Sequence, residues 1–314
     1  MSLNRLMRHL IAAICLLSIC PFSSKAQTDI DADMMAKNLF CSGPGYSYST
    51  WDHYWEGTQK RKNENIGTVT TQVFSYMGNY GVSKKLNLLF SIPYIKTKAS
   101  AGTLHSMKGL QDLSLFAKWM PYSNSIGKGK LSLIGVGGLS TPLGNYSPDF
   151  LPLSIGLRSK TVLVRAIADY ALGKFFVTAS GTYMRRNNIT IDRNSYYTTE
   201  MHLTDEVKMP DASSYNFRTG YRTKVLLAEA IINKMTTLGG FDISRNNMPF
   251  PSNRMNATTA GFRIKYEPKN FSRLSLLVNG EHTIAGRNVG QTTSVGGSIF
   301  YILNFNRKKE TNHN

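Results

Sequence analysis

Long apolar runs are scarce in this sequence of 314 residues. One lies between Leu10 and Leu17, and the mean hydropathy of the chain is −0.24. This pattern excludes a bundle of membrane-spanning helices, each of which needs about 20 apolar residues. Cysteine is also scarce, because Cys15 and Cys20 stand near the N-terminus and only Cys41 follows them. The later part of the chain therefore has no disulfide framework and no cysteine metal site.

Residues 1–26 have the features of an export signal. A basic start precedes the apolar core of residues 10–17, which is too short to span a bilayer as a helix. Residues 24–26 place small side chains at the positions that a signal peptidase reads, so we expect cleavage before Gln27. A lipoprotein signal is disfavoured, because the residue before Cys20 is not small.

Acidic residues are few, with 19 Asp and Glu against 37 Lys and Arg. The export signal removes three basic residues and no acidic ones, which leaves a net charge of +15 on the exported chain. Such a balance is typical of proteins that bind nucleic acid. Export argues against that partner, and the sequence has no recognition helix, zinc spacing or RNA-binding strand motif. We expect the excess to face anionic lipid headgroups and to line a lumen.

What the sequence does have is alternation. In the segment 292–305, Val295 and Ile299 fall on one parity and small polar residues fall on the other, with Phe300 and Ile302 as exceptions. A period of two places alternate side chains on opposite faces of a β-strand. Behind an export signal, many such strands are typical of an outer-membrane barrel, where one face meets lipid and the other a lumen.

We predict about twelve strands from this alternation and from the turn residues between the segments. They cover residues 45–56, 65–77, 84–97, 109–120, 129–141, 153–170, 174–186, 213–224, 227–243, 255–267, 271–285 and 292–305. The predicted fold is all-β, a transmembrane antiparallel β-barrel in the cell outer membrane. A secreted β-sandwich is the alternative. Aromatic residues at strand ends, such as Trp51 and Trp119, favour the barrel, because aromatic girdles mark both membrane interfaces.

The barrel would occupy residues 45–305. Residues 27–44 would precede it as a periplasmic segment or a plug, and residues 306–314 would follow as a polar tail. Short connectors alternate with longer polar stretches, as periplasmic turns alternate with outer loops in such barrels. The longer stretches are residues 97–108, 142–150, 187–212 and 244–254. The expected partners are outer-membrane lipids and lipopolysaccharide, the barrel-assembly machinery and a small-molecule solute.

Charged residues on the predicted strands can point inward, where they avoid a cost of roughly 2–4 kcal/mol for a charge on the lipid face at the membrane midplane. Seven basic residues take this phase: Lys118, Arg165, Arg218, Arg222, Arg263, Lys265 and Arg273. Asp112, Asp169 and Glu281 oppose them. This excess predicts a positive interior that favours anions. The alternative is a packed interior in which paired charges only stabilise the barrel.

Two further features concern the predicted lumen. Asp112 and Lys118 share a parity, which predicts an ion pair between them; alternatively, Asp112 caps a turn. Four aromatic residues are expected to face the lumen and to contact the ring of a solute: Phe74, Tyr76, Phe116 and Phe176.

A family resemblance rests on four short segments in a fixed order. They are Tyr80-Gly81-Val82-Ser83, Ile92-Pro93-Tyr94, Gly109-Leu110-Gln111-Asp112 and Thr141-Pro142-Leu143-Gly144. In this order they resemble the outer-membrane barrels grouped with the meta-pathway phenol-degradation transporters, which are distantly similar to the long-chain fatty acid channel. The match covers about residues 80–186, and Gln111 departs from it where a second glycine is usual. The resemblance implies passive uptake of hydrophobic or aromatic small molecules.

We therefore expect a barrel for passive transport of small hydrophobic or aromatic molecules, anionic ones in particular. A structural or adaptor barrel in secretion or envelope assembly is one alternative, and a lipid-modifying barrel enzyme is another. An enzyme would need a serine, a histidine and an orienting group together. His282 has only Glu281 beside it, on the opposite face of its strand. No nucleophile elbow, metal-spaced histidine pair or phosphate loop is present, so we expect no enzyme, metal or cofactor.

Overall fold

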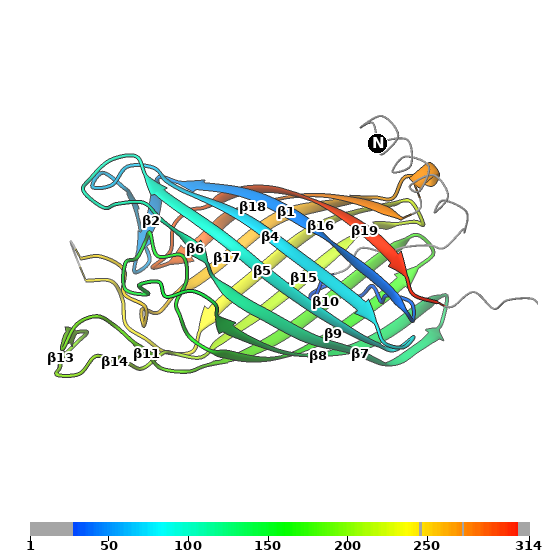
Figure 1. The fold of residues 1–314 in the computed structure, drawn as a ribbon, viewed down its shortest axis with the longest axis horizontal. Helices are drawn as coiled ribbons and strands as arrows, with labels where there is room; N and C mark the ends of the chain where they lie inside the picture. The colour runs from blue at the N-terminus through cyan, green and yellow to red at the C-terminus, as the bar shows by residue number, and fades with distance from the viewer. Residues whose placement is uncertain (1–27, 245–246, 272, 307–314) are drawn as a thin grey trace, which may run out of the picture.

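The computed structural model describes residues 28–244, 247–271 and 273–306. The predicted export signal, residues 1–26, and nearly all of the predicted tail lie outside these residues. Within them, twelve antiparallel strands close into one barrel (Figure 1). The sequence-based prediction of an all-β barrel of about twelve strands is confirmed.

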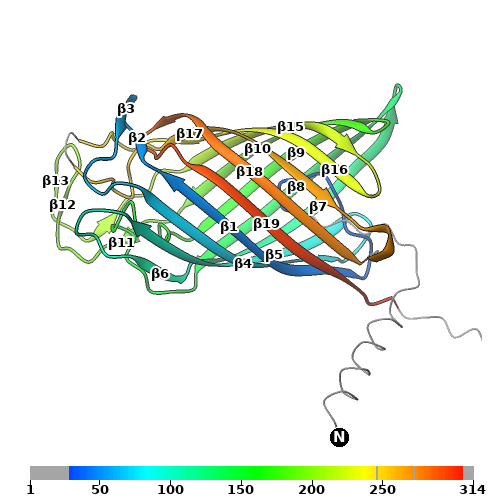
Figure 2. The ribbon, with the colours of Figure 1, turned by 90° about the horizontal axis from the view of Figure 1, so that it is seen from above.

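Each barrel strand pairs with its sequence neighbours. The strands are β1 (Leu39–Trp51), β4 (Val69–Gly81), β5 (Leu86–Ala99), β7 (Asp112–Ile126), β8 (Gly129–Pro142), β9 (Thr161–Leu172), β10 (Phe175–Arg186), β15 (Ala212–Arg222), β16 (Leu226–Thr237), β17 (Asn256–Tyr266), β18 (Leu274–Arg287) and β19 (Thr293–Asn304). The first and last strands, β1 and β19, lie side by side and pair from Leu39↔Asn304 to Thr50↔Thr293 (Figure 2). This pairing closes the sheet and leaves no barrel strand with a free edge.

The remaining elements are short and lie in connections. They are β2 (His53–Glu56), β3 (Gln59–Lys62), β6 (Met107–Leu110), β11 (Ile189–Thr190), β12 (Tyr196–Tyr197), β13 (Met201–His202), β14 (Glu206–Val207) and the 3₁₀ turn η1 (Lys269–Phe271). No helix in the part of the chain that the structure describes is long and apolar enough to cross a membrane.

The outer face of the barrel is apolar. Val162 and Val164 on β9 are 61% and 58% exposed, whereas Ile167 on the opposite parity is 2% exposed. The charged Lys118 on β7 is fully buried inside, beside the outward Trp119. Large apolar side chains exposed all around a closed barrel are stable only in lipid, so the barrel spans a membrane.

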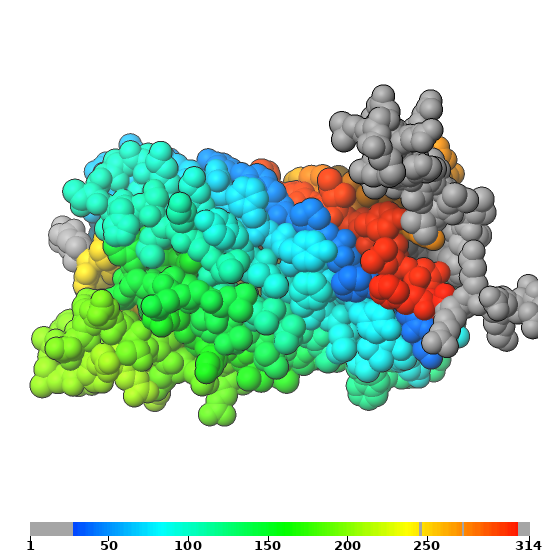
Figure 3. Space-filling view, in the orientation of Figure 1, coloured from blue at the N-terminus to red at the C-terminus, as the bar shows by residue number. Residues whose placement is uncertain are grey.

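The two ends of the barrel differ in the same way as in other outer-membrane barrels. Short turns join β4 to β5, β7 to β8 and β9 to β10 at the end where β1 begins and β19 ends. The long connections 143–160 and 187–211 and the described residues of 238–255 gather at the opposite end, where the yellow-green part of the surface projects furthest (Figure 3). We assign the short turns to the periplasm and the long loops to the exterior.

The first strand begins at Leu39, not at residue 45 as predicted. The prediction left Gly43 and Pro44 outside the strand, but both lie within β1. A Cβ atom at Gly43 would lie 1.9 Å from the carbonyl oxygen of Ile299 on β19, so glycine permits close approach of the two backbones here.

The predicted strand 153–170 was also too long, because β9 begins at Thr161. Leu153 and Ile155 alternate because they pack on the inner wall of the barrel, where the Thr97 hydroxyl donates to the Leu153 carbonyl at 2.5 Å. Residues 143–160 therefore form an external loop that folds into the mouth of the barrel.

A β-bulge lies in the segment that carries the family resemblance, where the partner of β5 changes from β7 to β6. Between the pairs Ser91↔Ser114 and Tyr94↔Leu110 the register shifts by one residue. The shift lies opposite Pro93, which has no N–H to donate, and Gln111 N donates to the Pro93 carbonyl at 3.0 Å. A bulge next to a strand proline bends the strand locally.

Candidate functional site in the lumen

The chain before the first strand lies inside the barrel. We call residues 28–36 the plug, because their side chains contact inward-facing residues of β7, β9, β15 and β17. Asp31 organises the plug: its carboxylate accepts hydrogen bonds from the Thr28 N–H at 2.7 Å and from the Asp33 N–H at 3.1 Å. The prediction left residues 27–44 as a periplasmic segment or a plug; residues 28–36 lie inside the barrel, whereas residues 39–44 belong to β1.

Lys118 of β7 binds the plug most closely. Its Nζ donates to the Asp31 carboxylate at 2.8 Å and to the carbonyls of Thr28 and Asp33 at 3.0 and 2.8 Å. An ammonium group has three N–H donors, so all three are satisfied.

Four other wall cations contact the carboxylates of the plug, among them Arg222, whose Nε lies 3.8 Å from Asp33 Oδ1. Arg165 Nη1 lies 2.6 Å from the carboxylate of Asp29, and Lys265 Nζ lies 3.2 Å from that of Asp33. Arg263 Nη1 lies 3.4 Å from the second carboxylate oxygen of Asp31. These buried pairs are hard to break one partner at a time, since an unpaired buried charge costs roughly 3–5 kcal/mol.

Other ion pairs join wall residues to one another. Glu229 of β16 lies 2.8 Å from Arg218 Nη1 and 2.6 Å from Arg263 Nε. Asp169 of β9 lies 3.2 Å from Arg222, whose guanidinium also stacks 3.9 Å from the ring centre of Phe176. Because these pairs lie on neighbouring or nearby strands, they link the part of the wall that runs from β9 to β17.

The resulting cluster is balanced in charge. Its six cations are Lys118, Arg165, Arg218, Arg222, Arg263 and Lys265, and its six carboxylates are Asp29, Asp31, Asp33, Asp169, Glu229 and Glu267. The predicted excess of seven inward cations over three carboxylates is therefore corrected. The prediction had no contacts for the plug and missed Glu229, so it omitted most of the negative charge.

Several candidate residues lie elsewhere. Asp112 does not pair with Lys118, because six residues along a strand separate the two by about 20 Å. Its carboxylate accepts a hydrogen bond from Tyr146 Oη at 2.5 Å, and burial and this bond raise the pKa of the Tyr146 phenol. Arg273 lies just before β18, half-buried, and forms no ion pair within the described residues. Glu281 accepts a hydrogen bond from the Thr259 hydroxyl and lines the lumen above the cluster.

The aromatic prediction is half right. Phe116 packs on the inward residues Ile134 and Val136, and Phe176 is 2% exposed beneath Arg222. Phe74 and Tyr76 point the other way: each is 49% exposed on the outer face. On β4, Val73 and Met77 take the inward parity instead, which is one residue out of phase with the prediction.

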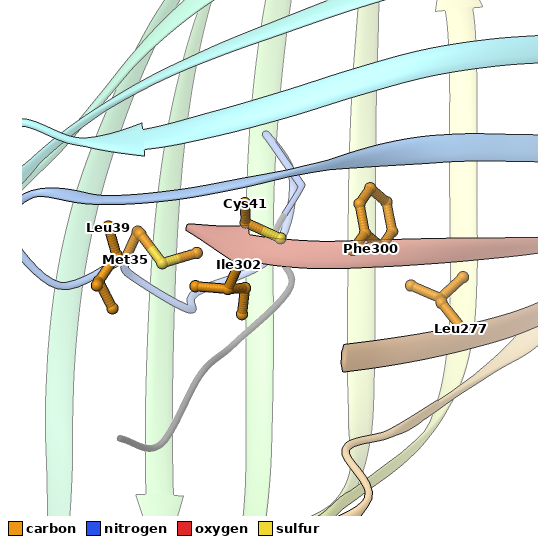
Figure 4. Packing of buried hydrophobic residues seen from close by; sticks show 6 residues of the cluster. All are labelled: Met35, Leu39, Cys41, Leu277, Phe300 and Ile302. Carbon is orange, nitrogen blue, oxygen red and sulfur yellow. The ribbon is translucent and has the colours of Figure 1, made fainter. Parts of the chain in front are cut away.

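An apolar cluster anchors the plug to the wall. Met35 lies between Leu39 and Ile302, with Cys41, Phe300 and Leu277 beside them (Figure 4). Phe300 and Ile302 are the two residues that break the alternation of the last strand. They break it because at this depth the lumen holds the plug and not water, a signal that the sequence contains.

The plug backbone also fits closely against the periplasmic rim. Asn38, with φ of +61°, donates its N–H to the Gly81 carbonyl at 2.7 Å. A Cβ atom at Gly81 would lie 2.1 Å from the carbonyl oxygen of Ala36. Glycine at this position is therefore what lets the chain turn from the plug into β1.

On the external side of the plug, which we call above it, the lumen is hollow. A cavity of about 490 Å³ lies there, with Thr28 and Ile30 of the plug among its lining residues. Arg165, Arg218 and Arg263 contribute its charged part. Its apolar part consists of Met77, Met184, Ile231, Met235, Leu277 and Phe300. Asn216, Asn233 and Asn279 add hydrogen-bonding amides.

Two histidines of the described residues contact threonines. His282 Nδ1 lies 2.8 Å from the Thr293 hydroxyl, and His202 Nε2 lies 2.9 Å from the Thr198 hydroxyl. No group of three or more His, Cys, Asp or Glu residues within residues 28–244, 247–271 and 273–306 is arranged to hold a metal ion.

Comparison with known proteins gives similarity of fold. No family model matches the chain, and no curated protein matches it. A solved outer membrane channel from Pseudomonas putida F1 superimposes with a TM-score of 0.70 at 15% sequence identity, covering 89% of this chain and 100% of the channel. This chain has the fold of an outer-membrane channel. The fold implied by the family resemblance is thereby confirmed.

Other solved barrels are less similar to this outer-membrane barrel. The translocator domain of the autotransporter NalP from Neisseria meningitidis has a TM-score of 0.47 at 11% identity, covering 96% of this chain and 95% of that one. The outer membrane protein OprD from Pseudomonas aeruginosa has a TM-score of 0.39 at 10% identity, covering 89% and 97%.

Proposed function

We propose that this barrel is a passive channel for small molecules that combine an apolar or aromatic body with a polar or anionic group. The observation that carries the proposal is the cavity of about 490 Å³ above the plug. The solved channel from Pseudomonas putida F1, which shares the fold, supports transport as the general function.

The lining of the cavity supports the solute class. Methionine, isoleucine, leucine and phenylalanine side chains would contact an apolar body, and methionine adapts its shape to different ligands. Arg165, Arg218 and Arg263 would orient a carboxylate or hydroxyl group. Sites for small molecules commonly combine a mostly apolar wall with a few polar groups that fix orientation.

Passage through the barrel requires the plug to move, because the plug fills the lumen at the level of Lys118 and Lys265. Moving it would also change the charge of the pathway. Without Asp29, Asp31 and Asp33, the cluster keeps its six cations but only three carboxylates, Asp169, Glu229 and Glu267. We propose that the open channel is positive and favours anions, whereas the closed channel is neutral.

Uptake into vesicles tests this function. Wild-type protein in liposomes should admit benzoate faster than an aliphatic acid of similar size. Asn233→Trp, which fills the cavity, should reduce uptake several-fold, whereas Ile232→Trp on the lipid face of the same strand should not. A barrel that admits neither acid, with or without its plug, would overturn transport.

The filled periplasmic half favours a second candidate, a structural or adaptor barrel whose outer loops bind a partner. Such a barrel needs no open path, and a plug held by ion pairs would only stabilise it. The vesicle experiment separates the two, because an intact adaptor barrel would admit neither acid, whereas an intact transport barrel would admit benzoate.

A further inference from the structure

The external loops of this barrel form an ordered cap. The loop 187–211 contains the short strand pairs β11–β14 and β12–β13, and its buried residues include Ile191, Tyr196 and Val207. Leu157 from the loop 143–160 and Phe250 from the loop 238–255 pack on this cluster. Three loops far apart in the sequence therefore share one apolar core outside the membrane.

One side chain fixes the loop 238–255. Asn253 is 1% exposed, its Oδ1 accepts from the Phe250 N–H at 2.6 Å, and its Nδ2 donates to the Phe241 carbonyl at 3.1 Å. The two phenylalanines are thereby held at a ring-centre distance of 6.3 Å. A loop tied in this way presents its rings in a fixed arrangement before any ligand arrives.

A second cavity, of about 400 Å³, lies among these loops. Its aromatic lining residues are Phe150, Tyr196, Tyr197, Phe241 and Phe250. The ring of Phe250 is central, since it stacks on Tyr196 at 5.2 Å and lies 5.7 Å from the Arg193 guanidinium. No residue that lines this cavity also lines the one above the plug.

The polar part of the cavity is already neutralised. Arg193 Nη2 lies 2.8 Å from Asp149 Oδ2, and Arg193 Nε donates to the same oxygen at 3.0 Å. A free anion would have to compete with Asp149 for the guanidinium. A neutral ligand would meet aromatic faces, the Arg193–Asp149 pair and the polar side chains of Ser244 and Asn247.

We propose that this cavity is a capture site for neutral, planar aromatic molecules that carry a hydrogen-bonding group. Ring faces favour offset or edge-to-face contacts with another ring, and Asp149 or Arg193 would bind the polar group. The proposal deepens the proposed function, since the site would collect solute at the external mouth. Its link to the mouth is the loop 143–160, which places Phe150 in the cavity and Leu153 against the inner wall of the barrel.

Binding of indole to the protein in lipid nanodiscs tests the proposal, with empty nanodiscs as the background and saturation-transfer NMR as the readout. Wild-type protein should bind indole saturably and cyclohexanol at least tenfold more weakly. Phe250→Leu keeps apolar volume but removes the ring, and should weaken indole binding at least tenfold. Phe271→Leu, at an exposed ring in the periplasmic turn η1, is the matched control and should bind as wild type.

A second variant tests the site independently, in case Phe250→Leu disturbs the folding of the cap. Leu104→Trp leaves the existing rings in place and fills the cavity from its edge, so it should also abolish indole binding. Equal binding by wild type, Phe250→Leu and Leu104→Trp, or no saturable binding at all, would overturn the capture site. Uptake of benzoate without indole binding would leave the proposed function standing and remove this site. Indole binding without uptake of benzoate would leave the capture site standing and remove the proposed function.

Discussion

The two halves of the lumen accommodate their polar side chains in different ways. The periplasmic half is packed: Lys118 is fully buried, and the plug supplies carboxylates for it and for four other cations. The external half is hollow, and amides and guanidinium groups there face a cavity of about 490 Å³. The wall is therefore charged in both halves, and in the periplasmic half the plug provides the partners that allow those charges to be buried.

Removing the plug should erase the difference between the halves. Deletion of residues 28–36 removes Asp29, Asp31 and Asp33 together with the anchor Met35. Water would then hydrate the freed cations, so we expect the barrel to fold, to conduct several-fold more current and to favour anions. Planar bilayer recordings in a salt gradient measure both effects. An unchanged reversal potential would contradict the charge assignment.

Loss of one buried cation should have the next largest effect. Lys118→Met leaves three acceptors of the plug without their donor, which costs roughly 3–5 kcal/mol when a buried pair loses one partner. The wall strands do not depend on this contact, so the cost should fall on plug docking and produce frequent openings in single-channel records. Lys130→Met, at an exposed position on β8, is the control. If single-channel records of Lys118→Met showed no more openings than those of wild type, contacts other than those of Lys118 would hold the plug in place.

Weakening the apolar anchor should give a smaller effect of the same kind. Met35→Ala removes a side chain that is 2% exposed, and large-to-small changes of this type cost roughly 2–5 kcal/mol. We expect short openings without a change in ion selectivity, because no charge is lost. Ile299→Ala, which removes a side chain from the lipid face of β19, should not change gating.

Cysteine labelling along β18 sharpens the comparison without disturbing the plug. Asn279→Cys lines the hollow half and should react with a water-soluble thiol reagent, whereas Ser275→Cys, at a fully buried position, should react only after the plug is deleted. Val278→Cys points to lipid and should react with a lipid-phase reagent. The wild-type protein, whose Cys41 is 2% exposed, gives the background. Equal labelling of all three positions would contradict the assignment of side chains on β18 to the lumen and to lipid.

The smallest effect is expected at the C-terminus. Removal of residues 306–314 should leave membrane insertion intact, because β19 ends at Asn304. Within the described residues the change loses two hydrogen bonds, from Asn38 Nδ2 to Asn306 Oδ1 at 3.1 Å and from the Asn306 N–H to Asn304 Oδ1 at 2.9 Å, each worth roughly 0.5–1.5 kcal/mol. Heat-modified migration of the folded barrel in gels measures insertion. Failure to insert would make the tail part of the assembly signal.

Much of the barrel could be predicted from sequence, because a period of two is a strong and repeated signal. The lining phase was correct wherever charges fixed it, as at Lys118 and Arg263, and wrong at Phe74 and Tyr76, where aromatic residues suit either face. The plug contacts could not be predicted, since they join residues more than 80 positions apart in sequence. Two signals did point to them: three aspartates at alternate positions from Asp29, and the apolar exceptions in the last strand.

The close connection between the plug and β1 has a consequence for gating kinetics. The plug behaves as a ligand that is covalently linked to its own binding site. The linker consists only of the few residues that join Met35 to Leu39 at the periplasmic rim. Short linkers give effective concentrations in the millimolar range, so a released plug rebinds from within the same molecule. Openings should therefore be brief and independent of protein concentration. A synthetic peptide with the sequence of residues 28–36 should block the plug-deleted channel from the periplasmic side alone, and only at concentrations that approach this local value.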